Sequence, residues 1–309
     1  MNLDALPHID AVALESLLPM PSAIDVIEAL LRSGFDPETD PGRQVVDVAA
    51  GDVLVMPSHT RSSVGVKVAT VAPDNPARGL PRIQAVYLLF DADTLGPVAL
   101  FDGTALTSLR TPAVSAVAVR HLARPNAAHL VLFGTGPQAQ GHLTAMRAVL
   151  PIEQVTVVAR DAARAERLVG WCRSDLALAA HVGSPEAVAE ADVVACCTTA
   201  RTPLFRGELL ADHAVVVAIG SHEADVREVD DQTVERSSVI VEARSAALRE
   251  AGDVIIPVES GVLDPSRLIG LADVVRGAAV LAEGPRLYKS VGMSWQDLAV
   301  ATAAYERLD

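Results

Sequence analysis

The chain has 309 residues, of which 50% are hydrophobic and 21% are charged, a balance typical of a packed globular protein. At about 150 residues per domain, this length predicts two domains. The net charge of −14 at pH 7 gives an acidic surface that repels phosphate backbones, so we expect no nucleic acid partner, although a local basic cluster can still bind a small anion.

The three cysteines predict neither a disulfide framework nor a metal site. Cys172, Cys196 and Cys197 show no zinc spacing such as C-x-x-C, and the adjacent pair lies in an apolar run, where thiols behave as small core side chains. The N-terminus lacks a basic stretch followed by an apolar segment, and no apolar run reaches ~18 residues without charge. We therefore expect a cytoplasmic protein with no membrane partner.

The first third of the chain predicts helices followed by a sheet. Apolar residues recur at helical spacing between positions 9 and 34, where Pro19 and Pro21 divide the stretch in two. From position 44 onward, short β-branched or alternating runs are separated by Gly and Pro clusters, which predicts an antiparallel or mixed sheet. The expected strands are Val45–Val48, Asp52–Met56, Val64–Thr70, Gln84–Phe90 and Pro97–Asp102. An Ala- and Val-rich helix, Thr107–Leu122, is expected next, and Arg124–Asn126 interrupts the pattern.

Residues 128–243 alternate between strands and helices, which predicts an α/β domain with a doubly wound parallel sheet. The expected helices are Gln138–Val149 and Ala162–Cys172. The expected strands are His129–Phe133, Val155–Ala159, Ala191–Thr198, Ala214–Ile219 and Ser238–Glu242. The tail from about Pro285 ends in an amphipathic helix, Trp295–Leu308, which such a sheet does not need. We therefore place domain boundaries at 123/124 and 284/285.

A glycine-rich turn, Gly134-Thr135-Gly136-Pro137-Gln138-Ala139, lies between the first of these strands and its helix. This is the pattern G-x-G-x-x-A in the context that dinucleotide binding requires, because the first glycine allows the tight turn and the second lets the backbone approach the pyrophosphate. The small third residue lets helix and strand pack closely, and the free N–H groups of the helix N-terminus face the phosphates. The sequence therefore predicts a Rossmann domain that binds NAD or NADP through residues 134–139.

The end of the second strand of this domain bears on the choice of cofactor. An acidic residue there binds the ribose 2′-hydroxyl of NAD, but this strand ends Val158-Ala159-Arg160-Asp161, with Ala159 at the acidic position. Arg160 can pair with a 2′-phosphate, so NADP(H) is favoured over NAD(H). Asp161 keeps NAD open as the alternative.

Three basic residues of the first domain stand near the ends of expected strands or helices: Arg43, Lys67 and Arg110. Lys67 lies in an apolar strand, where a lysine needs a partner or a functional role. Basic residues that converge on one pocket can hold a carboxylate, and they can lower the pKa of Lys67 into the range useful for proton transfer. The sequence alone leaves open whether the three converge.

Five segments occur in an order that resembles one known family. They are Arg43…Met56-Pro57, Gly65-Val66-Lys67, the block Leu106-Thr107-Ser108-Leu109-Arg110-Thr111-Pro112-Ala113-Val114-Ser115-Ala116, the Gly134–Ala139 turn, and Lys289-Ser290-Val291-Gly292…Gln296-Asp297. Together they make the chain similar to the ornithine cyclodeaminase/mu-crystallin family over nearly its whole length. The block around Arg110 is the most specific of the five.

The resemblance implies a Rossmann domain, residues 124–284, inserted between the two parts, 1–123 and 285–309, of an α+β domain for substrate binding and dimerisation. It implies a homodimeric NAD(P)-dependent oxidoreductase that acts on the C–N bond of an amino acid or a cyclic imino acid. By position, Arg43, Lys67 and Arg110 match residues that grip the substrate carboxylate, and Lys67 is also in reach for acid–base chemistry. Further candidate cofactor contacts are Arg110, Thr198, Gly220, Ser221, Ser290 and Gly292.

Two positions depart from the cyclodeaminase pattern. True ornithine cyclodeaminases have an Asp in the loop after the fifth Rossmann strand, where this chain reads Ala218–Asp225 with His222 at about that place. This loop is more similar to that of mu-crystallin, which is associated with ketimine reduction. Histidine can donate or accept a proton near pH 7, so His222 is a second candidate catalytic residue. The other departure is Arg82, where the cyclodeaminases have a Thr near the cofactor.

The sequence therefore predicts an amino-acid dehydrogenase or a cyclic ketimine reductase. Two alternatives stay open. One is ornithine cyclodeaminase itself, which converts ornithine to proline and ammonia, and the other is a non-catalytic NADP(H)-binding protein like some crystallin-type relatives.

Overall fold

In the computed structural model, which describes residues 6–308, the chain forms two compact units. Unit 1 comprises the residues up to Ala113 together with the segment from Met293 onward, and unit 2 comprises Val114–Gly292. The sequence places these boundaries at 123/124 and 284/285. The first boundary falls instead inside one long helix, α3 (Gly103–Leu122).

Unit 1 is built on a six-stranded sheet with the order β1-β6-β5-β4-β3-β2. Neighbouring strands from β2 to β6 run antiparallel and β1 joins β6 in parallel, so the sheet is mixed. The strands are β1 (His8–Ile9), β2 (Gln44–Val48), β3 (Gly51–His59), β4 (Ser63–Val71), β5 (Ile83–Asp91) and β6 (Pro97–Asp102). The helices are α1 (Ala11–Leu17), α2 (Met20–Arg32), the first part of α3, and α10 (Ser294–Tyr305).

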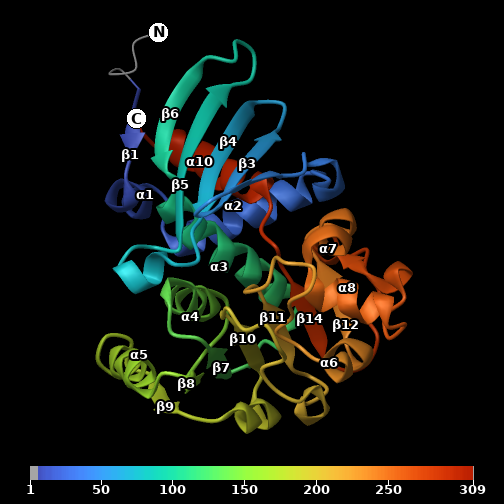
Figure 1. Ribbon diagram of the computed structural model, residues 1–309. Coiled ribbons are helices and arrows are strands. Elements are labelled where there is room, and N and C mark those ends of the chain that lie inside the picture. The colour runs from blue at the N-terminus through green and yellow to red at the C-terminus, as the bar shows by residue number, and fades with distance from the viewer. Residues whose placement is uncertain (1–5, 309) are drawn as a thin grey trace. The chain divides into compact units, whose positions relative to one another are not determined.

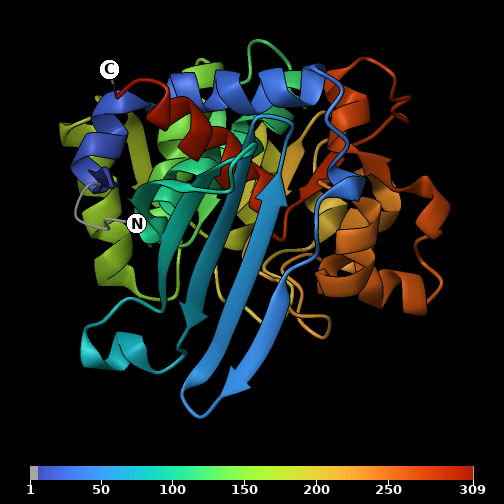
Figure 2. The ribbon, with the colours of Figure 1, turned by 90° about the horizontal axis from the view of Figure 1, so that it is seen from above.

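Helices α2 and α10 cover one face of this sheet, and α10 packs on β3, β4 and β5 (Figures 1 and 2). Alternation along the strands decides which side chains this packing buries. On β4, Lys67 and Ala69 are buried on the helix-covered face, whereas Val68 between them points to the opposite face and is only partly buried. The register places Lys67 between Met56 of β3 and Tyr87 of β5, so a lysine stands within an apolar core.

Unit 2 is a doubly wound parallel sheet with the order β13-β12-β14-β11-β10-β7-β8-β9. The run β9, β8, β7, β10, β11 has the Rossmann strand order 3-2-1-4-5, and β14, the last strand of the unit in the chain, takes the place of the sixth, which confirms the fold class predicted from the sequence. The strands are β7 (His129–Phe133), β8 (Gln154–Val158), β9 (Ala179–Val182), β10 (Val193–Cys196), β11 (Val215–Ala218), β12 (Ser238–Val241), β13 (Ile269–Gly270) and β14 (Arg286–Lys289). The helices are the rest of α3, α4 (Pro137–Val149), α5 (Ala162–Ser174), α6 (Asp231–Arg236), α7 (Arg244–Glu250), α8 (Gly252–Glu259) and α9 (Leu271–Val275).

Strand β14 comes from the tail that the sequence assigns to the first domain. It inserts between β11 and β12 and pairs with both, and Leu287 and Tyr288 are fully buried there. Its sequence, Arg-Leu-Tyr-Lys, has only two apolar residues between two cations, unlike the apolar runs that identify β10, β11 and β12, so the parallel sheet continues further along the chain than the sequence pattern indicates.

Residues 6–308 contain neither a membrane-spanning helix nor a metal-binding cluster. No helix in this range is long and apolar enough to cross a membrane, and no group of three or more His, Cys, Asp or Glu side chains is placed to hold a metal ion. The three cysteines are unpaired thiols, of which Cys172 and Cys196 are buried.

Candidate active site

A cluster of buried charge in unit 1 centres on Asp297 of α10. Its Oδ2 accepts a hydrogen bond from Nζ of Lys67 at 2.6 Å, and its Oδ1 lies 3.4 Å from Nε of Arg110. Lys67 also donates to Oγ1 of Thr107 at 3.3 Å. The side chains of Lys67, Arg110 and Asp297 are 2%, 6% and 0% exposed, so two cations share one carboxylate away from solvent.

Gln296 and Arg43 complete the surroundings of this cluster. Nη1 of Arg110 donates to Oε1 of Gln296 at 2.7 Å, which holds the guanidinium in one orientation. Arg43, just before β2, lies near enough for its charge to lower the pKa of Lys67. The structure therefore brings together the three basic residues whose convergence the sequence leaves open.

Burial lowers the pKa of Lys67 to about 8, because an ammonium removed from water is less stable in its charged form. Asp297 opposes this shift, while the charges of Arg110 and Arg43 add to it. A lysine with this pKa is mostly protonated at pH 7 and gives up its proton readily, which suits an acid–base group.

Asp40 fixes the beginning of α10 and so helps to place Asp297. Its carboxylate accepts a hydrogen bond from Oγ of Ser58 on β3 at 2.5 Å and another from the N–H of Trp295 at 3.1 Å. Met293, which precedes the helix, offers no side-chain cap, so Asp40 supplies the acceptor from a distant part of the chain. Burial raises the pKa of Asp40 to about 6.

Gly65 and Tyr87 explain why a glycine stands two residues before Lys67. A Cβ on Gly65 would lie 1.9 Å from the hydroxyl oxygen of Tyr87, so only glycine fits beside that ring. The hydroxyl of Tyr87 is buried and finds no hydrogen-bond partner within residues 6–308, and burial raises its pKa well above the usual value. Tyr87 is therefore a neutral phenol next to the charged cluster.

In unit 2, the turn after β7 has the backbone that a dinucleotide requires. Gly134 has φ +107°, and a Cβ there would lie 2.3 Å from the carbonyl oxygen of Cys197. A Cβ on Gly136 would meet nothing within 4 Å, so this backbone faces open space. Helix α4 begins at Pro137 without a side-chain cap on its N–H groups, and Ala139 is fully buried. These residues fit the pyrophosphate of a nicotinamide dinucleotide.

Gln138 and Thr135 complete this turn, and His142 supports it from α4. The ring of His142 bridges the carbonyl oxygen of Gln138 at 2.7 Å and Oγ of Ser115 at 3.0 Å. Burial lowers the pKa of His142 to about 4, so the ring is neutral, donates to the carbonyl and accepts from the hydroxyl. Oε1 of Gln138 is buried and has no hydrogen-bond partner among residues 6–308.

The end of β8 carries cations rather than a free acid. Asp161 is the N-cap of α5, where its side chain accepts the N–H of Arg164 at 3.0 Å, and this bond lowers its pKa. Arg160 is exposed, and the side chain of Arg164 is 67% exposed. The acidic residue that keeps NAD open in the sequence is thus engaged in capping a helix.

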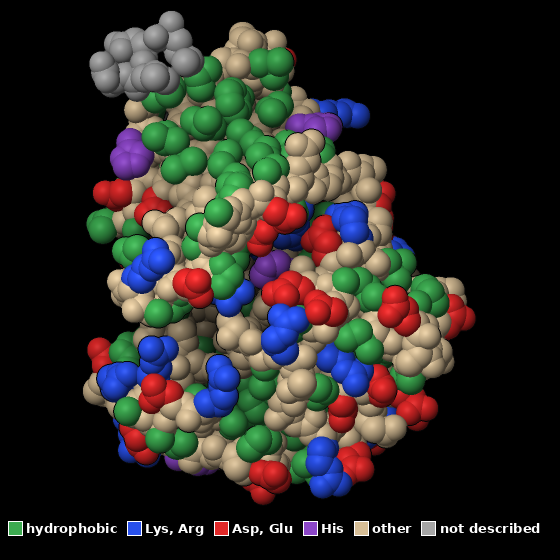
Figure 3. Space-filling view, viewed as in Figure 1, with side chains coloured by type: hydrophobic (Ala, Val, Ile, Leu, Met, Phe, Trp, Pro, Cys, Tyr) green, Lys and Arg blue, Asp and Glu red, His purple; other side chains and the backbone are tan. Residues whose placement is uncertain are grey.

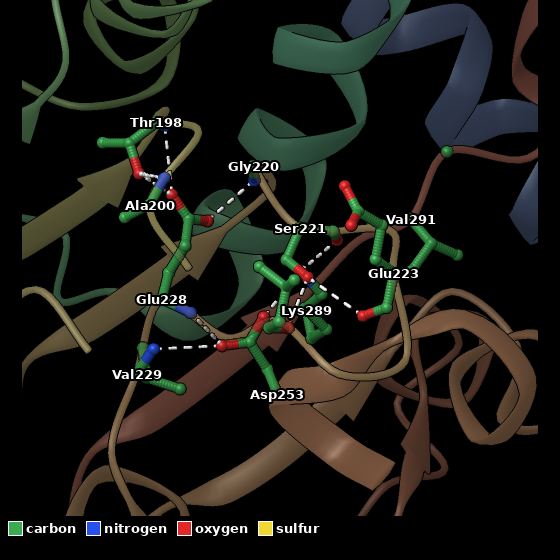
Figure 4. Close-up of polar contacts among 12 residues, drawn as sticks. Thr198, Ala200, Gly220, Ser221, Glu223, Glu228, Val229, Asp253, Lys289 and Val291 are labelled. Atoms are coloured by element: carbon green, nitrogen blue, oxygen red, sulfur yellow. Dashed lines mark hydrogen bonds and ion pairs between the residues drawn. The ribbon is translucent and has the colours of Figure 1, made fainter. Parts of the chain in front are cut away.

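The remaining candidates lie on loops at the carboxyl ends of three neighbouring strands of unit 2, part of which Figure 4 shows. They are Thr198 after β10, Gly220, Ser221 and His222 after β11, and Ser290 and Gly292 after β14. In a parallel sheet these loops lie at the same edge as the turn after β7, which is the edge where dinucleotides bind.

Two buried glutamates hold these loops. Glu228 accepts hydrogen bonds from the N–H and the hydroxyl of Thr198 and from the N–H of Gly220. Glu242 accepts the hydroxyl of Ser290 at 2.8 Å and the N–H groups of the next two residues at 2.9 and 3.0 Å. Each of these three loops therefore has a carboxylate that fixes its backbone.

The sequence identifies the cations of both units but misses the acids that organise them. Asp297 appears in the family segment Gln296-Asp297 without an assigned role. Glu228, Glu242 and Asp253 are not singled out by any pattern. Glu242 leaves one local signal, because an acid that directly follows the apolar strand β12 is unusual in a buried setting.

Comparison with known proteins identifies the family. The model of the ornithine cyclodeaminase/mu-crystallin family matches residues 9–309. The chain belongs to this family. A Δ1-pyrroline-2-carboxylate reductase of Colwellia psychrerythraea is 33% identical, over 92% of this chain and 94% of its own length.

Two solved structures share the fold over the full length. Thermococcus litoralis Δ1-pyrroline-2-carboxylate reductase, in complex with NADH and L-proline, matches with a TM-score of 0.92 and 31% identity, covering 98% of this chain and 97% of that one. An archaeal alanine dehydrogenase dimer with bound NAD matches with a TM-score of 0.91 and 28% identity, covering 98% and 95%. The chain is an NAD(P)-dependent oxidoreductase that acts on the C–N bond of an amino acid or imino acid, which confirms the reaction class predicted from the sequence.

Proposed function

We propose that this enzyme reduces a small cyclic imino acid of the Δ1-pyrroline-2-carboxylate type. The observation that carries the proposal is the buried cluster of unit 1, in which Lys67 and Arg110 share the single carboxylate of Asp297. This cluster holds more positive than negative charge, and one substrate carboxylate balances it. The reductases among the relatives, which are named for such a ring, support this choice of substrate.

The basic residues orient the substrate by its carboxylate. In Arg110, Nη1 is tied to Gln296 and Nε faces Asp297, so the guanidinium is fixed before substrate arrives. We assign Nη2 of Arg110, Nζ of Lys67 and the guanidinium of Arg43 to the substrate carboxylate. Holding that group fixes the adjacent imine carbon, which lowers the entropy that must be lost on the way to the transition state.

Reduction also needs a proton on the imine nitrogen. Lys67, with its pKa near 8, is protonated at neutral pH and is the donor that we assign. His222, in the loop after β11, is the alternative donor. If Lys67 donates, kcat/KM falls as the pH rises through about 8, because a neutral lysine neither donates this proton nor attracts the carboxylate.

We assign the cofactor to unit 2, where its nicotinamide ring supplies the hydride. The Gly134–Ala139 turn would hold the pyrophosphate. The nicotinamide end would contact the loops after β10, β11 and β14 through Thr198, Gly220, Ser221, Ser290 and Gly292. Arg110, also a candidate cofactor contact, is bound to Asp297 and Gln296, which favours the substrate role for it.

We propose a preference for NADP(H) over NAD(H). Arg160 is exposed at the end of β8, where a 2′-phosphate would lie, and Asp161 is used as a helix cap. The two solved relatives hold NADH and NAD. The residues at the end of the second strand set this preference separately in each chain, so the relatives' cofactors do not decide it.

A substrate panel tests the proposed function. Oxidation of NADPH and of NADH is followed with Δ1-pyrroline-2-carboxylate, with its six-membered homologue, and with α-keto acids plus ammonia. We expect turnover of the cyclic imino acids and formation of the corresponding ring amino acid. Proline formed from ornithine without net change in cofactor would establish the cyclodeaminase alternative. Tight cofactor binding without turnover of any candidate would establish the non-catalytic one.

We further propose a homodimer formed through the face of the unit 1 sheet opposite α2 and α10. That face carries Val46 and Val86, which are 53% and 49% exposed, and Figure 3 shows apolar side chains gathered over this sheet. Apolar patches of this kind mark protein interfaces. The alanine dehydrogenase relative is a dimer. Light scattering should give a dimer for the wild type and a monomer for Val86→Glu.

A further inference from the structure

Glu228 is a buried carboxylate of unit 2 that contributes no atom to the proposed hydride transfer. It is 0% exposed, and its Oε1 accepts the N–H and the hydroxyl of Thr198 at 3.0 and 2.6 Å. Its Oε2 accepts the N–H of Gly220 at 2.7 Å. One side chain thus joins the loop after β10 to the loop after β11, as Figure 4 shows.

Asp253 and Lys289 hold Glu228 from its backbone side. Oδ1 of Asp253 accepts the N–H groups of Glu228 and Val229 at 2.7 and 3.0 Å. Its Oδ2 lies 2.8 Å from Nζ of Lys289, which also donates to the carbonyl oxygen of Ser221 at 2.6 Å. Lys289 is the last residue of β14, so the network links the carboxyl ends of β10, β11 and β14.

The two loops that Glu228 joins approach each other too closely for any side chain. A Cβ on Gly220 would lie 2.0 Å from the carbonyl oxygen of Thr198 and 2.5 Å from Oε1 of Glu228. The separation of the loops is therefore set by the carboxylate that both of them bind.

The strands that carry these loops are the fourth, fifth and sixth of the Rossmann order, and they form its second mononucleotide-binding half. The adenosine half of the cofactor belongs to β7, β8 and β9, where the second strand reads the adenosine ribose. The loops after β10 and β11 consequently face the nicotinamide half.

We infer that Glu228 is a positioning residue for the nicotinamide half of the cofactor, acting through Thr198 and Gly220, with Lys289 and Asp253 holding it in place. The inference rests on the proposed cofactor site but not on the identity of the substrate. A carboxylate suits this task because both oxygens accept, whereas a glutamine would turn an N–H donor towards one of the three donors.

Glu228 is also sensitive to pH near neutrality. Burial raises its pKa to about 7, and Asp253 adds to this, while Lys289 and the hydrogen bonds oppose it. Its charge also acts on Cys196 and Cys197, and burial raises the pKa of both thiols, so they stay neutral. Protonation removes one acceptor oxygen from the network. Binding of the nicotinamide half should therefore weaken as the pH falls through about 7.

The test measures Kd by cofactor fluorescence on the full chain without substrate, for the wild type, Glu228→Gln and a matched control, Asp192→Asn. Asp192 accepts the N–H groups of Ala128 and His129 at 2.8 and 3.0 Å at the amino edge of the same sheet, away from the cofactor edge. The measured quantity is Kd for the whole cofactor divided by Kd for its adenosine half, 2′,5′-ADP for NADPH or ADP for NADH. The fragment ends in a phosphate monoester with a second pKa of about 6, which the whole cofactor lacks, so ratios are compared between proteins at the same pH. We expect the ratio to rise about tenfold in Glu228→Gln and to stay unchanged in Asp192→Asn.

The pH dependence of this ratio separates Glu228 from the phosphates, because the fragment titrates identically with every protein. The wild-type ratio divided by the ratio of Glu228→Gln at the same pH should rise several-fold between pH 8 and pH 6. A quotient independent of pH overturns the inference. So does an unchanged ratio in Glu228→Gln, which would mean that the residue serves only the fold. If these binding results hold while no imino acid is turned over, the proposed function fails and the inference stands.

Discussion

The two buried ion clusters of this enzyme have opposite charge ratios. In unit 1, Lys67 and Arg110 share Asp297, whereas in unit 2, Lys289 pairs with Asp253 and its charge also acts on Glu228. The carboxylates of unit 2 accept hydrogen bonds from backbone N–H groups, so their negative charge is already stabilised within the fold. In unit 1, Lys67 and Arg110 instead donate to the neutral side chains of Thr107 and Gln296 besides Asp297. The excess positive charge of unit 1 fits the proposed substrate carboxylate, whereas the carboxylates of unit 2 hold the backbone.

The largest effect on activity should follow from removing one of the two cations that share Asp297. Lys67→Met keeps most of the side-chain volume but removes a carboxylate contact and the assigned proton donor. We expect kcat/KM for the cyclic imino acid to fall about 10³-fold, while Kd for the cofactor stays unchanged. Steady-state kinetics and cofactor fluorescence measure the two quantities. A variant within tenfold of the wild type would show that the substrate binds elsewhere.

Asp297→Asn should cause the next largest loss, because it removes the charge that anchors both cations of unit 1. Asp297 raises the pKa of Lys67, so without it Lys67 loses its proton below pH 8 rather than near it. We expect kcat/KM to fall about 30-fold at pH 8 and less at pH 6.5, with the high-pH decline moved to lower pH. A pH–rate profile measures this.

Glu228→Gln is the matched control, since it alters the cluster of unit 2 and should leave the high-pH decline of kcat/KM at the wild-type pH. If kcat/KM of Asp297→Asn declines at the same pH as that of the wild type, Lys67 is not the titrating group.

The difference between the clusters also explains what the sequence can and cannot predict. Lys67 stands out because a cation within an apolar strand is a local anomaly. Asp297 does not stand out, because its bond to Lys67 spans 230 positions and exists only after folding. Glu228 is hidden for the same reason, since it bonds to Thr198, 30 positions away. The sequence therefore reveals the cations that we propose as ligand contacts more readily than the acids that pair with them.

In the fold, too, local features are predictable from the sequence and long-range ones are not. Most strands of both sheets are predictable because alternation and apolar runs are local, and the Gly134–Ala139 turn identifies the nucleotide edge. Strand β14 is not predictable, since Arg286 and Lys289 leave only two apolar residues in it, and its structure comes from pairing with β11 and β12. That strand is also why unit 2 extends to Gly292 rather than ending at residue 284.

A smaller effect on activity should follow from Arg160→Ser, which removes an exposed cation of unit 2 that we assign to the cofactor. Loss of a charge-assisted bond to the 2′-phosphate should raise the KM for NADPH about tenfold and leave the KM for NADH unchanged. Arg206→Ser is the control, because Arg206 is also exposed but is paired with Glu208. Equal effects of Arg160→Ser on both cofactors would contradict the proposed preference for NADP(H).

The smallest effect should come from Asp40→Asn, which alters a satisfied carboxylate inside unit 1. Asparagine can keep both bonds, with its oxygen accepting from Trp295 and its amide donating to Ser58. Because the pKa of Asp40 is raised from 3.8 to about 6 in the fold, its ionisation opposes folding, and the wild type loses stability relative to the variant as the pH rises through this range. Urea unfolding should show the variant gaining about 1 kcal/mol on the wild type between pH 5 and pH 7.5. The KM for the imino acid should change less than twofold. A large rise in KM would mean that Asp40 belongs to the cluster that binds the substrate. In that case the charged residues of unit 1 could not be divided into ligand contacts and groups satisfied within the fold.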